Sequence, residues 1–506
     1  MERSEGNDWK LSKSEWCIAG FYLFCLAILA SILPSHFGFP LDDSWIHQTV
    51  ARNLAERHVL GYLPGVTSSG SSSLLWTWVL ALGYMLPLNP VIFCTIIHGF
   101  MFALIGVLLK RLAGEGPEAW VIAACPALCG NFMWLGLVGM ECVLFVLLSL
   151  LAVQLWFSGA NAVWVGVALG LLAITRPEGI LLSPILVLLR PRRTWTDVAK
   201  ASVTVIPFVL VNLFINWRTS RSLLPQTMQG RLWLAVKLSG GLEKARFLCA
   251  AQWFTRLLKT WHIFSGSALF GFASPILLGV IVLFLGIPIV LAIARLYHRP
   301  KLWAICLWWI AINLVYLIVL PSTGQGGRYQ PFQLFLPLSL FFAGLYYVIK
   351  NRWVIGALIV VSGVLSLSTW RGAAIADIDQ INNEHGAMAR WLAEQPKETL
   401  AVFDIGRIGY ELRGNLIDLG GLVDKSFLPY LKEGRVSEYL AAKGVQTVVL
   451  PTTDEPSDIG IGTLLNLDPK TLIPVKTFCD ERKQWEIAML SSNTALPCQR
   501  AFRFSR

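Results

Sequence analysis

Charged residues are scarce in this sequence of 506 residues. Only 14% are Asp, Glu, Lys or Arg, whereas 55% are hydrophobic. Because a soluble domain carries about 25% charged residues, this composition excludes a chain that is soluble along its whole length. The net charge is +11, and the basic excess lies in residues 1–369, whereas residues 370–506 are slightly acidic. We therefore predict a membrane part, 1–369, followed by a soluble part, 370–506.

Several sequence motifs are also missing. The cysteines form no Cys-x-x-Cys pair and no zinc-spaced cluster with histidine. No glycine-rich dinucleotide fingerprint and no internal repeat occurs, and no basic run with interleaved aromatics indicates a nucleic-acid partner. The basic residues instead indicate membrane topology and contact with anionic lipid. Cys479 and Cys498 lie in the polar C-terminal part, where a disulfide is expected if that part is outside the cytoplasm.

Eleven apolar segments are candidate membrane spans, because a spanning helix takes about 20 mostly apolar residues. They run near 16–33, 91–110, 119–137, 142–158, 162–175, 178–190, 200–216, 270–294, 302–320, 331–349 and 353–369. The first follows Lys10 and Lys13 without a small-residue cleavage site, and we interpret it as an uncleaved signal-anchor.

Basic loops set the predicted orientation. With eleven spans, five clusters fall on one side, which the positive-inside rule makes the cytoplasm: Lys10/Lys13, Lys110/Arg111, Arg190/Arg192/Arg193, Arg295/Arg299/Lys301 and Lys350/Arg352. The N-terminus is then cytoplasmic, and residues 370–506 lie on the outer side of the membrane. The stretch 74–88 is also apolar enough to span. If it crossed the membrane, every later loop would change sides and four basic clusters would face outward, so we interpret it as an embedded or interfacial helix on the outer side. The alternative is a true span compensated by one lost near 142–190.

The soluble part alternates helical patterns (376–395, 434–443) with strand-like runs (400–404, 446–450), which predicts an α/β domain. The remaining outer segments are the loop 34–73, the turns 138–141 and 175–179, and the loops 217–268 and 321–330.

Ionisable residues near the membrane converge on this outer side, where they are functional candidates because charge at membrane depth is costly. They are Asp42, Asp43, Glu141, Arg176, Glu178, Arg218, Arg221 and Arg328. A cavity lined by such acids and arginines suits an anionic lipid-linked substrate. One reaction of such a substrate is sugar transfer from a lipid phosphate, which needs a carboxylate to take a proton from the acceptor hydroxyl. The departing phosphate, with a second pKa of about 6, needs positive charge, which arginine supplies through its planar fork.

Each candidate also has a structural alternative. Asp42 and Asp43 are suited to cap the helix that follows them, and Glu141 to cap the next span. Arg176 and Glu178 are spaced for an ion pair around Pro177, and Arg328 for a snorkelling position at the interface. His47 and His58 fall on an amphipathic stretch, and Asp404, Asp418 and Asp424 are interpreted as loop acids.

The stretch Leu41-Asp-Asp-Ser-Trp-Ile-His-Gln-Thr-Val-Ala-Arg-Asn-Leu-Ala-Glu resembles the first outer loop of GT-C fold glycosyltransferases. Further blocks resemble that family in the same order. They are Gly61-Tyr-Leu-Pro-Gly, Ser73-Leu-Leu-Trp-Thr, Gly139-Met-Glu141, Thr175-Arg-Pro-Glu-Gly179, Leu224-Pro-Gln-Thr227, Gly327-Arg-Tyr329, Asp404-Ile-Gly-Arg-Ile-Gly-Tyr and Ile417-Asp-Leu-Gly-Gly-Leu-Val-Asp424.

Within the fold, the chain most resembles mycobacterial-type arabinofuranosyltransferases, and more distantly lipid A aminoarabinose transferases and protein O-mannosyltransferases. The resemblance implies a polyprenyl-phosphate donor, arabinofuranose among the candidate sugars, and transfer with inversion to an envelope glycan, a lipid or an exported protein such as a pilin. It implies Asp42 as general base with Asp43 beside it, and Arg328 and Arg176 as phosphate ligands. Ser44-Trp45, His47-Gln48 and Gln226 depart from the family pattern.

The other cavity candidates are Glu141, Glu178, His47, Gln226, Thr227, Arg218 and Arg221. The sequence leaves metal dependence open, because two adjacent acids can hold a divalent cation such as Mg, Mn or Ca, whereas the arginines can make an ion unnecessary. Two other functions fit lipid-linked sugars. A flippase predicts pseudo-symmetric halves, which the sequence lacks, and an O-antigen ligase or polymerase uses diphosphate donors and does not need the Asp-Asp pair.

Overall fold

The computed structural model describes residues 10–505 except 66, 69, 87, 190–192, 224, 261–274, 323, 397 and 481–495, and it gives no side-chain surroundings for 254–260, 275–283 and 285. Arg190, Arg192, Leu224 and the predicted loop residues 261–268 therefore lie outside the described residues.

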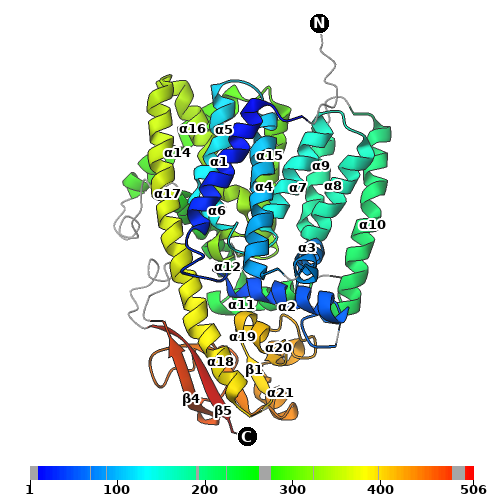
Figure 1. The fold of residues 1–506 in the computed structure, drawn as a ribbon, viewed down its shortest axis with the longest axis vertical. Coiled ribbons are helices and arrows are strands. Elements are labelled where there is room, and N and C mark those ends of the chain that lie inside the picture. Colours follow the sequence, from blue (N-terminus) through cyan, green and yellow to red (C-terminus); the bar gives the residue numbers. More distant parts are fainter. Residues whose placement is uncertain are drawn as a thin grey trace.

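Apolar helices form a bundle that makes up most of the molecule (Figure 1). Within the described residues, six stretches are long and apolar enough to cross a membrane, and shorter apolar helices pack among them. The bundle contains α1 (Lys13–Ala30), α4 (Pro90–Ala113), α5 (Pro117–Leu128), α7 (Cys142–Phe157), α8 (Ala162–Thr175), α9 (Leu182–Leu188), α10 (Trp195–Ser220), α14 (Pro275–Arg295), α15 (Pro300–Ile318), α16 (Pro331–Ile349) and α17 (Arg352–Gln380). The protein is thus an α-helical polytopic membrane protein.

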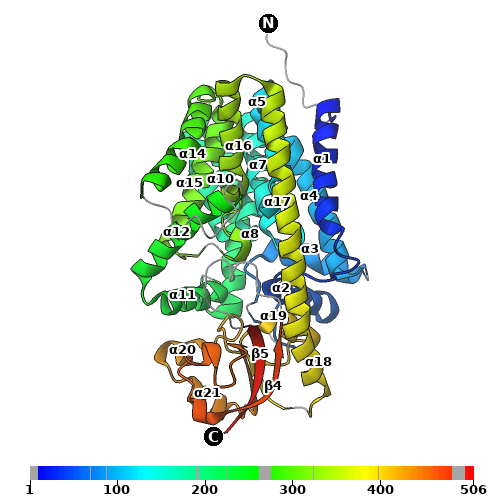
Figure 2. The same ribbon diagram turned by 90° about the vertical axis from the view of Figure 1, so that its left-hand side faces the viewer.

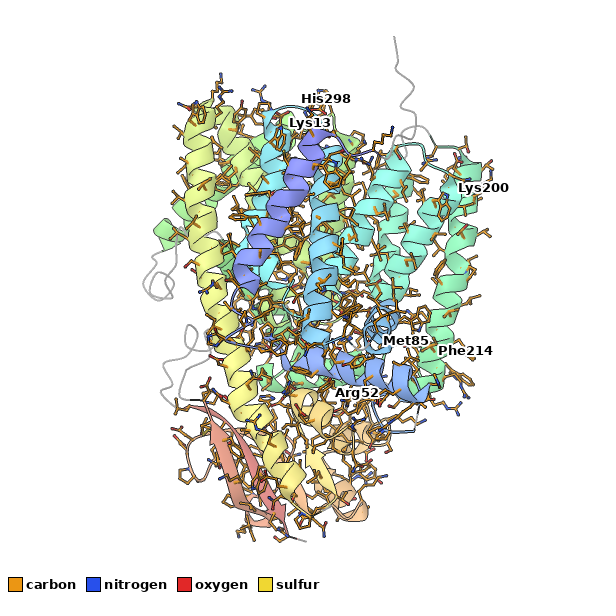
Figure 3. The ribbon with its side chains drawn as sticks, in the orientation of Figure 1. Lys13, Arg52, Met85, Lys200, Phe214 and His298 are labelled. Carbon is orange, nitrogen blue, oxygen red and sulfur yellow. A yellow bond between two sulfur atoms is a disulfide. The ribbon has the colours of Figure 1, made fainter. Side chains whose placement is uncertain are left out.

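The basic loops gather at one end of this bundle, and the C-terminal domain lies at the other. Lys13, Lys200 and His298 mark the first end in Figure 3. Arg111 pairs there with Glu15 at 2.5 Å, and Arg299 reaches Glu118 at 2.7 Å. The clustering agrees with the pattern from which the orientation was predicted.

Three predicted segments differ in the structure. The predicted span 119–137 breaks at Cys129, after Pro126, into α5 and the short α6 (Gly130–Trp134), because proline removes a backbone donor and crowds the preceding turn. The span predicted at 178–190 starts as a 3-10 helix, η1 (Pro177–Leu181), before α9. The predicted loop 217–268 contains two helices, α11 (Gln226–Ser239) and α12 (Leu242–Thr260), separated by Gly240 in a left-handed conformation.

Two helices lie across the end of the bundle that faces the C-terminal domain. α2 (Asp42–Arg57) lies between the bundle and this domain, and α3 (Leu74–Met85) is seen nearly end-on at a similar level (Figure 1). α3 therefore does not run alongside the spanning helices. The interpretation of this segment as an embedded or interfacial helix stays a prediction.

The C-terminal domain is α/β, as predicted. A five-stranded sheet has the order β2-β1-β3-β5-β4, from β1 (Leu400–Val402), β2 (Ile417–Asp418), β3 (Thr447–Thr453), β4 (Leu472–Cys479) and β5 (Pro497–Phe504). The β1 pairings with β2 and β3 are parallel, and β5 is antiparallel to both β3 and β4. A disulfide joins Cys479 to Cys498 across β4 and β5. The helices are α19 (Ile405–Glu411), α20 (Leu428–Glu433) and α21 (Val436–Ala442).

No break separates the bundle from this domain along α17. The helix passes the predicted boundary at 369/370 and continues through a π-helix, η3 (Ile381–Gly386), into α18 (Ala387–Glu394). Figure 2 shows this rod running from the far end of the bundle to the side of the sheet. The span predicted at 353–369 is therefore the first part of a longer continuous helical element.

Candidate active site

Asp43 is the meeting point of two arginines from distant parts of the chain. Arg231 of α11 donates to Asp43 Oδ2 at 2.7 Å, and Arg328, from the loop before α16, donates to the same oxygen. Burial alone would raise the pKa of the Asp43 carboxyl, but the two guanidinium groups outweigh it and hold that pKa well below its usual range. The result is a partly exposed carboxylate with an excess of positive charge around it.

A third arginine, Arg176, fixes the backbone that carries Arg328. Arg176 donates to the carbonyl oxygens of Arg328, at 3.2 Å, and of Tyr329, at 3.0 Å. Its Nε pairs with Glu178 at 2.7 Å, and it also donates to the Tyr316 hydroxyl. The predicted ion pair between Arg176 and Glu178 is thus present, and Arg176 is occupied with holding the loop in place.

Arg328 is buried, with 2% of its surface exposed. The alternative that it snorkels at the membrane surface is therefore wrong. Glycines shape its turn, since Gly324, Gly326 and Gly327 all have positive φ, and a Cβ on Gly326 would overlap the Trp134 ring.

Asp42 has different surroundings from its neighbour. Its oxygens accept from the backbone N–H of Gly406 at 2.8 Å, from that of Arg407 at 2.7 Å, and lie 3.0 Å from His385 Nδ1. Asp42 therefore fastens α2 to the first turn of α19 in the C-terminal domain. Neither aspartate makes a side-chain cap for α2, whose N-cap is Leu41, so the capping alternative is wrong.

The π-helix η3 supplies the histidine of this junction. Burial lowers the pKa of the His385 imidazole, but Asp42 and the nearby Asp404 outweigh it and raise that pKa to about 9. Glu384, in the same π-helix, has a pKa raised by burial to about 8. π-helices often occur at functional sites, and this one places His385 against Asp42 and near Asp404.

Glu141 and His47 lie behind the arginine cluster. His47 Nε2 lies 3.9 Å from Glu141 Oε2, and this oxygen is buried without a hydrogen bond. Glu141 is the N-cap of α7 but makes no side-chain cap, which removes its capping alternative. His47 Nδ1 lies 3.0 Å from the Ser71 hydroxyl, and burial lowers the pKa of this histidine.

A cavity of about 130 Å³ lies where α2, α11 and the C-terminal domain meet. It is lined by Asp42, Asp43, Ile46, Gly230, Arg231, Leu234, Phe403, Asp404, Ile405, Gly420 and Leu422. Pockets for drug-sized ligands span about 300–1,000 Å³, so this cavity suits one small headgroup. The membrane part contributes the arginine and two carboxyls, and the C-terminal domain contributes the third carboxyl.

The structure does not bring every predicted residue to this cavity. Arg218 and Arg221 are exposed near the end of α10, and Arg221 lies over the Trp217 ring. Gln226 is buried and donates to the Gly421 carbonyl at 3.1 Å, and Thr227 follows it on α11. Gln226 thus helps to hold α11 against the C-terminal domain.

Three residues of the junction were missed from the sequence. Arg231 fell in a segment interpreted as a loop, where nothing distinguished it from neighbouring basic residues. His385 lies in a helical pattern whose phase the π-helix changes. Asp404 did carry a signal, because it opens one of the family-like blocks, but it was interpreted as a loop acid.

The predicted divalent cation would need a group of suitable ligands. Among the residues that the structure describes, no group of three His, Cys, Asp or Glu side chains is arranged to hold a metal ion. The adjacent acids Asp42 and Asp43 face different partners, so a divalent cation stays an untested expectation.

The helical bundle, the crossing helices at its end and the small C-terminal sheet define the GT-C fold of membrane glycosyltransferases. Two solved structures share it. The *Archaeoglobus fulgidus* oligosaccharyltransferase tethered to an acceptor peptide with an NVT sequon matches with a TM-score of 0.54 and 14% identity, over 88% of this chain and 70% of that chain. ArnT from *Cupriavidus metallidurans* bound to undecaprenyl phosphate matches with a TM-score of 0.51 and 12% identity, over 97% of this chain and 98% of that chain.

Sequence comparison adds one match within the C-terminal part. A family described as a domain of unknown function (DUF8728) matches residues 374–500. No curated protein matches the chain. At such low identities the structural likeness shows the fold alone, and the predicted closeness to arabinofuranosyltransferases stays a prediction.

Proposed function

We propose that this protein is an integral membrane glycosyltransferase that transfers a sugar from a polyprenyl-phosphate donor, with inversion, on the outer face of a bacterial inner membrane. Arabinofuranose is the first sugar to test. The acceptor is an envelope glycan, a lipid or an exported protein. The observation that carries the proposal is the convergence of Arg231 and Arg328 on Asp43, beside a cavity at the membrane edge of a GT-C fold.

The arginine pair suits the leaving group of this reaction. When the bond from the anomeric carbon to the phosphate oxygen breaks, the lipid phosphate gains a second negative charge. Arg231 and Arg328 are held close together by Asp43, and Arg328 is fixed through its backbone by Arg176. A phosphate that enters replaces the Asp43 carboxylate as their partner, and preorganised positive charge of this kind lowers the barrier to bond breaking.

The donor and acceptor sides are supplied by different parts of the chain. α11 and the loop before α16 provide the two arginines, and the apolar helices of the bundle provide a surface for the polyprenyl tail. The C-terminal domain covers the cavity that would hold the sugar. The proton of the acceptor hydroxyl passes to a carboxylate of the cavity, and the sequence predicts Asp42 for that role. Undecaprenyl phosphate bound to ArnT, a protein of the same fold, supports a lipid phosphate as the donor carrier.

The test is release of free polyprenyl phosphate by the purified protein. Polyprenyl-phosphate sugars, with arabinofuranose and mannose among them, are offered with a crude envelope-glycan acceptor. We expect turnover with one donor, which falls about 10²- to 10³-fold in Arg328→Ala but persists in Arg218→Ala, where an exposed arginine is removed. Donor binding without turnover on any acceptor would instead favour a transporter of lipid-linked sugars.

A further inference from the structure

Asp404 is the carboxyl that the C-terminal domain contributes to the cavity. It stands directly before α19, next to Phe403 and Ile405, which also line the cavity. Asp42 holds this segment in place, because it accepts the backbone N–H groups two and three residues further on, at Gly406 and Arg407. The position of Asp404 is therefore determined by a contact between the two parts of the chain.

The three carboxyls of the cavity differ in how far their oxygens are already engaged. Asp42 accepts from two backbone N–H groups and contacts His385. Asp43 is neutralised by Arg231 and Arg328. Asp404 accepts one hydrogen bond, at 2.7 Å, from the neutral amide of Gln499, and its Oδ1 has no donor among the described residues. Its charge is the least compensated by direct contacts.

The pKa of Asp404 also suits proton transfer near neutral pH. Burial raises it, His385 opposes this rise, and Asp42 and Asp43 add to it, so that it reaches about 6. A general base works best when its pKa lies near the working pH. The Asp43 carboxylate, with its pKa held far lower, is a much weaker base.

We propose that Asp404 accepts the proton of the acceptor hydroxyl, and that Asp42 is a positioning residue that fastens the Asp404 segment over the cavity. This inference rests on the proposed function. An inverting displacement needs the base and the leaving group on opposite faces of the sugar. Arg231 comes from the membrane part and Asp404 from the domain that covers it, and both residues line the cavity. Arg328, also from the membrane part, pairs with Asp43 at the cavity wall.

The step balances as follows. The acceptor oxygen forms a bond to the anomeric carbon while the bond from that carbon to the phosphate oxygen breaks. The electron pair of the broken bond stays on the phosphate, which becomes a dianion beside Arg231 and Arg328. The hydroxyl proton moves to the Asp404 carboxylate and is later lost to water. No oxidant or metal is consumed.

The charged groups that face Asp404 fix the expected pH response. They are Asp42 and Asp43 on α2, Glu384 and His385 in the π-helix, and Arg231 across the cavity. The rate should fall as pH drops through about 6, when Asp404 takes up a proton. Since the Asp42 carboxylate raises the pKa of Asp404, Asp42→Asn should move this acid limb to lower pH.

The experiment measures polyprenyl phosphate release by the full-length protein from pH 5 to pH 9, at saturating donor. The variants are Asp404→Asn, Asp404→Glu and Asp42→Asn, with Asp468→Asn as an exposed aspartate of the same domain that does not line the cavity. We expect Asp404→Asn to lose about 10²- to 10⁴-fold in turnover and its acid limb, while it binds donor as wild type does. Asp404→Glu should recover part of the rate, and Asp468→Asn should match wild type.

Other outcomes separate the inference from the proposed function. If the wild-type protein shows no turnover with any donor, both the inference and the proposed function are contradicted. An active wild type, with an Asp404→Asn variant that keeps more than a tenth of the rate and the same acid limb, overturns the role of Asp404 alone. Thermal unfolding curves identify a misfolded variant. If Asp404→Asn misfolds, the acid limb of Asp404→Glu tests the role of Asp404. A proton acceptor of different pKa must shift this limb, so an unshifted limb would contradict the inference.

Discussion

The Asp42 carboxylate accepts a hydrogen bond of 2.8 Å from the backbone N–H of Gly406, a residue 364 positions further along the chain. This contact joins the first outer helix to the C-terminal domain at the edge of the cavity. Trp45 and Arg407 reinforce it, with the guanidinium 4.2 Å from the ring centroid. Catalysis by the proposed mechanism therefore depends on the docking of two parts that are far apart in sequence.

The glycine at this contact is the first point to test. A Cβ at position 406 would overlap both the backbone and the side chain of Asp42, so Gly406→Ala should push α19 away from α2. We expect a lower unfolding temperature and faster proteolysis of the C-terminal domain. Gly372→Ala is the matched control, because a Cβ there meets nothing within 4 Å. Equal stability of the two variants would show that α19 is not tightly docked.

The arginine cluster gives a second prediction. Arg231→Ala and Arg328→Ala should each lower turnover about 10²- to 10³-fold, the usual cost of one preorganised donor to a developing negative charge. Arg328→Lys should recover only part of the rate, because lysine lacks the planar fork. Initial rates and donor affinity distinguish a loss of binding from a loss in the chemical step. Unchanged rates in both alanine variants would contradict the phosphate role.

The pH dependence of stability follows from His385. Its pKa is about 9 in the folded protein and about 6.5 in an unfolded chain, so the folded state binds the proton more tightly. The stability from this group is fully present below pH 6.5 and is lost as pH rises through 9. We expect the unfolding temperature to fall across this window in wild type and to fall less in His385→Gln. Parallel curves for the two proteins would contradict the prediction.

The disulfide should stabilise the edge of the sheet. Cys479 and Cys498 are 19 positions apart, and closing a loop of this length contributes about 3 kcal/mol in the chain-entropy account. Replacing both by serine should lower the unfolding temperature of the C-terminal domain and make it insensitive to reductant. Cys17→Ser, at an exposed free cysteine, should leave the response to reductant unchanged.

Much of the architecture followed from composition and spacing. Long apolar runs predicted most of the bundle helices. Strand-like runs predicted β1 and β3, and a helical pattern predicted α21, because helix length and side-chain periodicity are local properties. The break at Cys129 was missed, because a membrane-spanning helix can contain a proline. The helices of 226–260 were missed, because amphipathic segments between membrane helices resemble loops.

The site divides along the same line. Asp42, Asp43 and Arg328 were noticed because charge is rare beside apolar helices, and the structure brings all three to one junction. Their partners, Arg231 and His385, are common residue types in polar segments. Only the packing of α11 and of the π-helix against α2 makes them special, and no local pattern reports such packing. Whether these residues catalyse sugar transfer is decided by the rate measurements described above.

The continuous rod of α17, η3 and α18 makes the junction sensitive to helical phase. Each residue of an α-helix turns the next by about 100°, and a π-turn accommodates one residue more than an α-turn. Deleting one residue from 381–386 would convert the π-turn into an α-turn and change which side chain faces Asp42. A one-residue insertion higher in the rod would likewise carry His385 around the axis, away from Asp42. The number of residues in α17, η3 and α18 is therefore constrained, because only this number brings His385 into contact with Asp42.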